Sequence, residues 1–326
     1  MSLIDITPHW IKKTYIAPAL LAWMRSRQYI RRYYTATDTR RDIRPAVIFM
    51  VDGRFNHGGL SDRLWGLIST YIACEKKGLE FKVNWVYPFR LTTFLEPAEV
   101  DWRITPEELT YDPRLATPVF VNNNHNVKNQ WKLLMRIGRS GKRQEHVYSP
   151  AHIERDRFGE YFALLFRPTA VLQNAIDEQQ KAIGGTYVSI TFRFQQLLGD
   201  FKEGNFPTLA AAEQQRLLDR SIATIEEIRR RHPEVDRILV TSDSGRMLQA
   251  AAELPYVYTI PGKLIHMSFT DESEAEMSHL KAFLDFFMIG GARKVYFAQA
   301  PGIYGSTFAH TASRLHKAPY EVIDIV

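Results

Sequence analysis

An arginine after an apolar run is the first candidate for chemistry. Arg193 follows Tyr187–Phe192, a stretch typical of a buried strand. Ligands bind outside the carboxyl ends of parallel strands, and a guanidinium is planar, permanently charged and able to donate paired hydrogen bonds to a pyrophosphate. The alternative is a structural ion pair with an acid such as Asp200. The residues leave both interpretations open.

A carboxylate follows a second apolar run in the same way. Asp243 comes after Ile238–Thr241 and Ser242, and its oxygens could accept hydrogen bonds from the N1–H and 2-amino groups of guanine. The alternative is that Asp243 or Ser242 is the N-cap of the next helix. Taken alone, the local residues favour the N-cap.

A glycine-containing turn precedes the first predicted helix of the chain. His57, Gly58 and Gly59 lie between a strand and this helix, where glycine lets the backbone approach a ligand and the helix N-terminus attracts an anion. The spacing differs from that of the dinucleotide fingerprint. The alternative, which local residues favour, is a tight turn with Asp62 as a stabilising anion in the first helical turn.

A second turn of small residues lies near the C-terminus. Gly305, Ser306 and Thr307 follow the predicted strand Lys294–Ala298 and open a helix, so they could cradle a phosphate. The alternative is a serine or threonine helix cap.

Short apolar runs alternate with amphipathic helices from residue 45 onwards, which predicts an α/β fold with two Rossmann-like domains. The predicted strands are Ala46–Val51, Phe81–Val86, Val119–Val121, Tyr187–Phe192, Arg237–Thr241, Tyr256–Ile260, Lys294–Ala298 and Tyr320–Ile325. The first predicted helix contains Leu64–Ile72 and ends near Gly78, and the others cover Phe158–Leu165, Ala170–Ile183, Ala211–Arg231, Gly245–Leu254, Met277–Ile289 and Ser306–Leu315. Residues 87–160 otherwise suggest loops and short helices.

The Gly184-Gly185 pair predicts the domain boundary. We therefore expect a basic N-terminal segment (1–44), an N-terminal acceptor-side α/β domain (45–184) and a C-terminal nucleotide-sugar-binding α/β domain (185–326), the last two roles resting on the family resemblance described below.

The formal net charge of +6 is concentrated in the first 44 residues, where arginines and lysines alternate with aromatic residues. Such a segment could lie on an anionic membrane surface, or it could be a helix that covers the core with a solvated basic face. Both interpretations stay open, and we expect no nucleic-acid partner.

The cellular compartment is predicted from two features. A single cysteine, Cys74, cannot form an internal disulfide. The apolar piece Ile16–Trp23 is short and is followed at once by Arg25 and Arg27, unlike a secretory signal. We expect a cytoplasmic protein, with peripheral contact at the inner membrane face through residues 1–44 as an option.

The order of the four motifs resembles that of fucosyltransferases with a GT-B-like fold: the nodulation fucosyltransferases, the core α1,6-fucosyltransferases and the protein O-fucosyltransferases. The matching stretches are His57–Leu64, Thr191–Arg193, Thr241–Asp243 and Gly305–Phe308. The chain departs from the family pattern at Thr191, where the family has histidine, and lacks the family's Arg-Gly-Asp continuation.

The resemblance implies an inverting, metal-independent transfer of fucose from GDP-fucose, the donor substrate, to a glycan or lipid-linked glycan. It assigns Arg193 to the β-phosphate, Asp243 to guanine, and Ser306 and Thr307 to the pyrophosphate. It also places His57, Gly58 and Gly59 in the donor-binding set. Asp200 and Glu203 follow the motif strand and are the candidates for the general base.

Two other functions stay open. One is a glycosyltransferase that uses a different nucleotide sugar. The other is a non-catalytic nucleotide- or glycan-binding protein on the same fold. A nicotinamide enzyme is disfavoured because the fingerprint glycines are absent.

Metal independence gives the first testable prediction. The sequence contains no Asp-x-Asp pair of the kind that holds a metal ion on donor phosphates, and its histidines have no ligand spacing. We therefore expect no metal and no cofactor, and transfer activity should persist in EDTA. Complete loss of transfer in EDTA, restored by Mg²⁺ or Mn²⁺, would contradict this.

Overall fold

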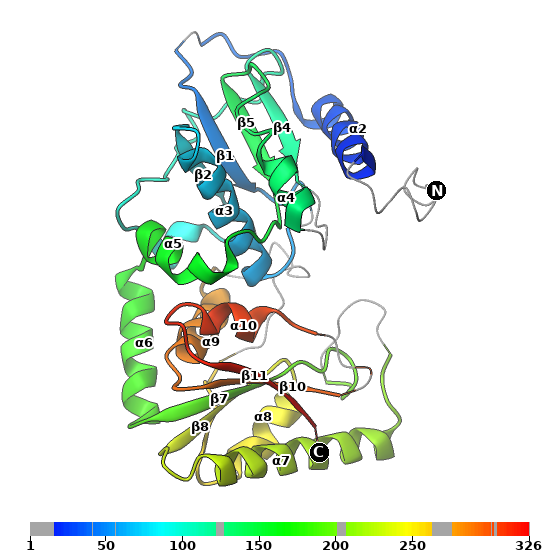
Figure 1. Ribbon diagram of the computed structural model, residues 1–326, viewed down its shortest axis with the longest axis vertical. Helices are drawn as coiled ribbons and strands as arrows, with labels where there is room; N and C mark the ends of the chain where they lie inside the picture. Colours follow the sequence, from blue (N-terminus) through cyan, green and yellow to red (C-terminus); the bar gives the residue numbers. More distant parts are fainter. Residues whose placement is uncertain are drawn as a thin grey trace. The chain divides into compact units, whose positions relative to one another are not determined.

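The computed structural model describes residues 16–40, 42–55, 57–121, 127–200, 207–262, 276–300, 302 and 305–325. The chain forms two compact units, each of them α/β (Figure 1). The first comprises residues 1–91, 97–155 and 161–166, and the second comprises 92–96, 156–160 and 167–326. The predicted α/β class is confirmed.

The first unit contains a four-stranded parallel sheet in the order β2-β1-β5-β4. Its strands are β1 (Ala46–Val51), β2 (Phe81–Trp85), β4 (Ala116–Phe120) and β5 (Gln144–Tyr148). The helices of this part of the chain are α2 (Ile16–Tyr33), α3 (Leu60–Glu75), α4 (Val127–Leu134) and, at the division between the units, α5 (Phe158–Leu165). A separate two-stranded sheet pairs β3 (Leu95–Pro97) with β6 (Phe166–Pro168), and η1 (Leu91–Thr93) and η2 (Arg155–Arg157) are short 3-10 turns.

Strand β5 is absent from the sequence prediction, although it lies beside β1 at the centre of the sheet. Its first three residues are polar, yet all three are buried and hydrogen-bonded. Gln144 accepts from the Thr110 N–H at 3.0 Å, and Glu145 accepts from backbone N–H groups at 2.6 and 2.9 Å. Tertiary partners therefore permit polar residues that do not resemble a buried strand.

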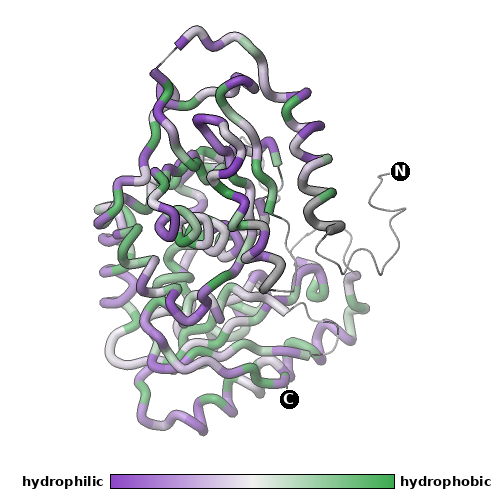
Figure 2. Tube along the Cα trace, turned by 45° about the horizontal axis from the view of Figure 1, so that its top comes forward, coloured by the Kyte–Doolittle hydropathy of each residue, from purple (hydrophilic) through white to green (hydrophobic). Residues whose placement is uncertain are grey.

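Helix α2 packs against strand β4 and contributes to the core of the first unit (Figure 1). Hydrophobic and hydrophilic residues alternate along it (Figure 2). Tyr29 is buried, with its ring 5.4 Å from that of Phe120 and 5.2 Å from that of Tyr148. The described part of residues 1–44 thus packs on the first α/β unit, as in the interpretation of a helix that covers the core.

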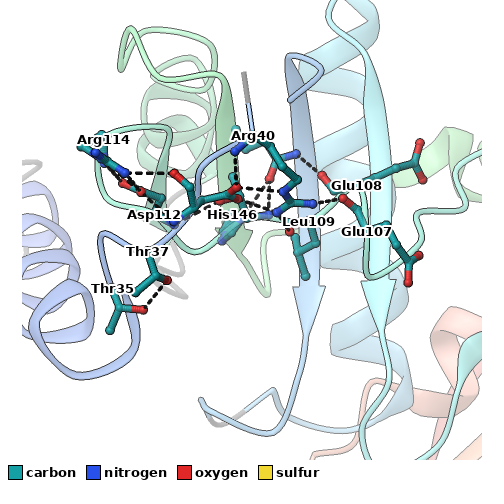
Figure 3. A network of polar contacts seen from close by, with 12 residues as sticks. Thr35, Thr37, Arg40, Glu107, Glu108, Leu109, Asp112, Arg114 and His146 are labelled. Atoms are coloured by element: carbon teal, nitrogen blue, oxygen red, sulfur yellow. Dashed lines mark hydrogen bonds and ion pairs between the residues drawn. The ribbon is translucent and has the colours of Figure 1, made fainter. Parts of the chain in front are cut away.

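The segment after α2, which contains Asp38 and Arg40, is bound to the same unit by ion pairs and hydrogen bonds (Figure 3). The Arg40 guanidinium donates to Asp38 at 2.8 Å and to the Leu109 carbonyl at 3.0 Å. The Asp38 N–H donates to Asp112 at 3.3 Å, and Arg114 donates back to the Asp38 carbonyl at 3.0 Å. At least one basic side chain of the N-terminal region, Arg40, therefore holds this segment on the first unit.

The second unit contains a five-stranded parallel sheet in the order β11-β10-β7-β8-β9. Its strands are β7 (Tyr187–Phe192), β8 (Arg237–Ser242), β9 (Val257–Tyr258), β10 (Val295–Gln299) and β11 (Tyr320–Asp324). Its helices are α6 (Ala170–Ile183), α7 (Ala211–Arg231), α8 (Gly245–Ala252), α9 (Leu280–Gly290) and α10 (Phe308–Ser313), with the 3-10 turn η3 (Glu276–His279) before α9.

This strand order has a topological switch point between β7 and β10, because the chain continues from β7 to β8 on one side and places β10 on the other. Helix α6 contacts α9 and belongs to the second unit. The expected boundary at Gly184-Gly185 therefore differs from the observed division by the whole of α6.

The buried histidine of β5 predicts how the stability of the first unit depends on pH. Burial lowers the pKa of His146 to about 3, so the folded state holds this ring neutral where the unfolded chain, with a pKa near 6.5, takes up a proton. Stability should fall by about 1.4 kcal/mol per pH unit as the pH drops from 6.5 towards 3.

Hydrogen exchange of the β1 and β5 amides measures this opening free energy, and His146→Gln should reduce its pH dependence. A variant that loses equal stability at pH 5 and at pH 8 would contradict the account.

Candidate functional site

Three of the predicted motifs lie at one edge of the second sheet. Arg193 follows β7 and Asp243 follows β8, and these two strands pair in parallel with Phe192 opposite Ser242. Ser306 and Thr307 come after β10, the neighbour of β7 on its other side. Arg193 and Asp243 thus lie at the carboxyl ends of two paired strands beside the switch point, where parallel α/β sheets bind ligands, and Ser306 and Thr307 lie in the connection from β10 to α10.

Arg193 and Asp243 form an ion pair between a guanidinium nitrogen, Nη1, and a carboxylate oxygen, Oδ2. Their side chains are 15% and 8% exposed, so the pair is largely removed from water but still reachable from outside. The structural partner suggested by the sequence was Asp200, and the structure shows Asp243 instead.

Asp243 also holds the backbone that follows β7. Its Oδ1 accepts from the Phe194 N–H at 2.8 Å, and its Oδ2 accepts from the Gln195 N–H at 2.7 Å. Gln195 has a φ of 54°, in the left-handed region, so the loop turns sharply there. Burial raises the pKa of the Asp243 carboxyl, while Arg193 and the two N–H donors oppose that shift. The carboxylate thus fixes both the loop and the guanidinium.

The N-cap of α8 is Ser244, so the alternative that assigned this cap to Asp243 or Ser242 is wrong. The Ser244 hydroxyl oxygen accepts from the Met247 N–H at 3.1 Å. Asp200 lies beside this helix end, because its Oδ2 accepts from the Ser244 hydroxyl at 2.9 Å and from the Arg246 N–H at 2.8 Å. Asp200 therefore stabilises the start of α8. Glu203, the other candidate base, lies outside the described residues.

The two hydroxyls before α10 have different roles. The Ser306 hydroxyl accepts from the Phe308 N–H at 3.2 Å. Thr307 is the N-cap residue, but its side chain makes no capping hydrogen bond. Ser306 thus binds the first N–H group of α10 from the position before the N-cap, and the Thr307 hydroxyl is not used for capping.

The glycine-containing turn of the first unit connects β1 to α3. Gly58 has a φ of 69°, and a Cβ atom there would lie 2.7 Å from a carboxylate oxygen of Asp62, so the position requires glycine. Gly59 is the N-cap of α3. The buried Arg63 donates to the Gly58 carbonyl at 3.0 Å and to the Tyr87 carbonyl at 2.9 Å. The motif arginine therefore fixes the shape of the turn.

Sequence reasoning missed a buried network at the carboxyl edge of the first sheet. Asp52 directly follows β1, and its carboxylate accepts from the Tyr148 hydroxyl at 2.9 Å. His57 Nε2 lies 3.2 Å from the Asp52 backbone nitrogen and 3.6 Å from its Oδ1. Burial lowers the pKa of His57, while the Asp52 carboxylate opposes that shift. The signal that could have revealed Asp52 is the one used for Asp243: a carboxylate immediately after an apolar strand.

Among residues that the structure describes, no three His, Cys, Asp or Glu side chains are grouped so that they could hold a metal ion.

The comparisons with known proteins give matches only among solved structures, since no family model and no curated protein sequence matches the chain. NodZ α-1,6-fucosyltransferase soaked with GDP-fucose is 14% identical, with a TM-score of 0.52 over 83% of this chain and 93% of that chain. Fucosyltransferase NodZ from Bradyrhizobium is 13% identical, with a TM-score of 0.50 over 82% and 92%. A mutant of FUT1 from Arabidopsis thaliana in complex with GDP is 11% identical, with a TM-score of 0.51 over 94% and 75%.

These similarities confirm the fold: two α/β units of the GT-B-like type found in fucosyltransferases, with a doubly wound parallel sheet in the second unit.

The Arg193–Asp243 pair generates a prediction about the second unit. Asp243→Asn removes the carboxylate charge and presents an amide N–H₂ group to donors, leaving the guanidinium without its counter-charge. Breaking a buried pair from one side typically costs about 3–5 kcal/mol of unfolding free energy. Urea unfolding of the variant measures this loss.

The matched control is the double variant Arg193→Met/Asp243→Asn, which has no unpaired charge and should recover much of that stability. A double variant as unstable as the sum of both single changes would show that the two side chains are not coupled.

Proposed function

We propose that this protein is a glycosyltransferase that transfers fucose from GDP-fucose to a glycan acceptor with inversion and without a metal ion. The observation that carries the proposal is the largely buried Arg193, held at the switch point of the second sheet. Two proteins of similar fold were crystallised with GDP-fucose or GDP, which supports this choice of donor.

In this proposal, Arg193 binds the β-phosphate and stabilises the negative charge that develops as GDP leaves. Asp243 keeps the guanidinium in place through their ion pair. Ser306 and Thr307 bind the pyrophosphate from the other side of β7. The assignment of Asp243 to guanine remains a proposal, and it requires the ligand to share a carboxylate that already accepts from the β7 loop.

Transfer itself needs an acceptor hydroxyl and a base. The hydroxyl oxygen attacks the anomeric carbon, the bond from that carbon to the phosphate oxygen breaks, and the base takes the hydroxyl proton. Asp200 and Glu203 are the proposed bases. His57, Gly58 and Gly59 remain proposed donor contacts.

We propose that the first unit binds the acceptor, which is a glycan or a lipid-linked glycan. We also propose that the protein works in the cytoplasm, at the inner face of the membrane.

A donor screen by mass spectrometry tests the proposal against the two alternatives. Purified protein is incubated without acceptor and hydrolysis is compared for GDP-fucose, GDP-mannose and UDP-sugars. Preferential hydrolysis of GDP-fucose is the expected result. Preference for another nucleotide sugar would identify a different glycosyltransferase, and GDP binding without turnover of any donor would identify a binding protein.

Arg193→Lys is the most informative variant for catalysis. Lysine keeps the counter-charge for Asp243, so the second unit should stay folded, but it loses the planar pair of donors. Turnover of GDP-fucose should fall by about 10²- to 10³-fold, the typical cost of removing one preorganised donor. Arg216→Lys, at an exposed position on α7, is the matched control. Equal turnover in the two variants would remove Arg193 from the mechanism.

Asp200→Asn separates a catalytic role from a structural one. Loss of a general base typically lowers the rate by about 10²- to 10⁴-fold and removes the corresponding limb of the pH–rate profile. If Asp200 only stabilises the start of α8, the melting temperature falls, the pH profile keeps its shape, and activity follows the folded fraction. Glu203→Gln, assayed in parallel, tests the other candidate.

A further inference from the structure

Helix α2 has a second face, whose described side chains are exposed. Tyr29 is buried on the inner face, whereas Leu20 and Trp23 are 54% and 49% exposed. Positions three and four residues apart share one side of a helix, which places Leu20, Trp23, Arg27 and Arg31 in one outward row. Arg27 and Arg31 are exposed. Apolar side chains therefore occupy the first half of this row and basic ones the second half.

The charge of α2 is of one sign. Its 18 residues contain four arginines and no aspartate or glutamate: Arg25, Arg27, Arg31 and Arg32. The Arg27 guanidinium lies 4.5 Å from the centre of the Trp23 ring, so an aromatic body and a cation are presented together. Tryptophan and arginine both suit the boundary between lipid headgroups and acyl chains, where one end of the side chain is apolar and the other polar.

No helix within the described parts of the chain is long and apolar enough to cross a membrane. A short apolar row beside a basic row is instead typical of a helix that lies in the plane of the membrane surface. Because the inner face of α2 is anchored in the first unit, binding would require no change in the fold.

We propose that the outward row of α2 docks on an anionic lipid bilayer. Leu20 and Trp23 enter the boundary between headgroups and acyl chains, and Arg27 and Arg31 pair with lipid phosphates. The proposal rests on exposure and charge complementarity, independently of the proposed transfer reaction, so each can fail without the other.

Co-sedimentation of the full chain with vesicles tests this docking. Vesicles containing phosphatidylglycerol should bind the protein, vesicles of phosphatidylcholine alone should bind it much less, and added salt should release it. Arg27→Gln/Arg31→Gln should weaken binding by about fivefold per arginine, hence about 25-fold. Leu20→Ser/Trp23→Ser should weaken it roughly tenfold or more, because the apolar anchor is lost.

The matched control is Arg216→Gln/Arg230→Gln, which removes the same charge from exposed positions on α7 and should leave binding almost unchanged. Circular dichroism confirms that each variant is folded.

Equal weakening by the control pair would show that only net charge matters and would overturn the proposal. Equal binding to both vesicle types would do the same. A concentration-dependent dimer that Trp23→Ser abolishes, with no vesicle binding, would assign the row to a second copy of the chain instead.

Discussion

The second unit depends on one ion pair between neighbouring parallel strands. A guanidinium that is only 15% exposed needs a nearby counter-charge, because burying an isolated charge is very costly. Asp243 supplies that charge from the end of β8 and uses its remaining acceptor sites to hold the backbone after β7. The register of β7 and β8 places Asp243 beside Arg193. Pairing of these strands therefore fixes both the guanidinium and the loop after β7.

The carboxyl edge of the first sheet is organised differently, although a carboxylate again follows an apolar strand. Asp52 receives a hydrogen bond from the Tyr148 hydroxyl, and burial lowers the pKa of the nearby His57 ring against the opposing effect of the Asp52 carboxylate. Both edges therefore carry an arginine paired with the carboxylate that follows a strand: Arg193 with Asp243 in the second unit, and the more exposed Arg54 with Asp52, at 3.9 Å, in the first.

The strongly apolar and amphipathic elements could be predicted from the sequence. Strand β7 and helix α7 have the predicted bounds, because β7 is a short run buried on both faces and α7 repeats its buried apolar residues with a helical period. Strand β5 could not be predicted, since its buried Gln144 and His146 depend on partners distant in sequence, and Glu145 on the backbone of the preceding turn. Similarly, local residues favoured a helix cap for Asp243, and only the pairing of β7 with β8 reveals its contact with Arg193.

The central claim is that Arg193, positioned by Asp243, binds the β-phosphate of the donor. Calorimetric titration with GDP and with GMP tests it most directly, because the two ligands differ only in that phosphate. The account predicts that the wild-type protein binds GDP more tightly than GMP by tenfold or more, roughly the worth of one charge-assisted hydrogen bond, and that Arg193→Lys loses most of this difference. Equal losses of GDP and GMP affinity in the variant, with the ratio unchanged, would contradict it.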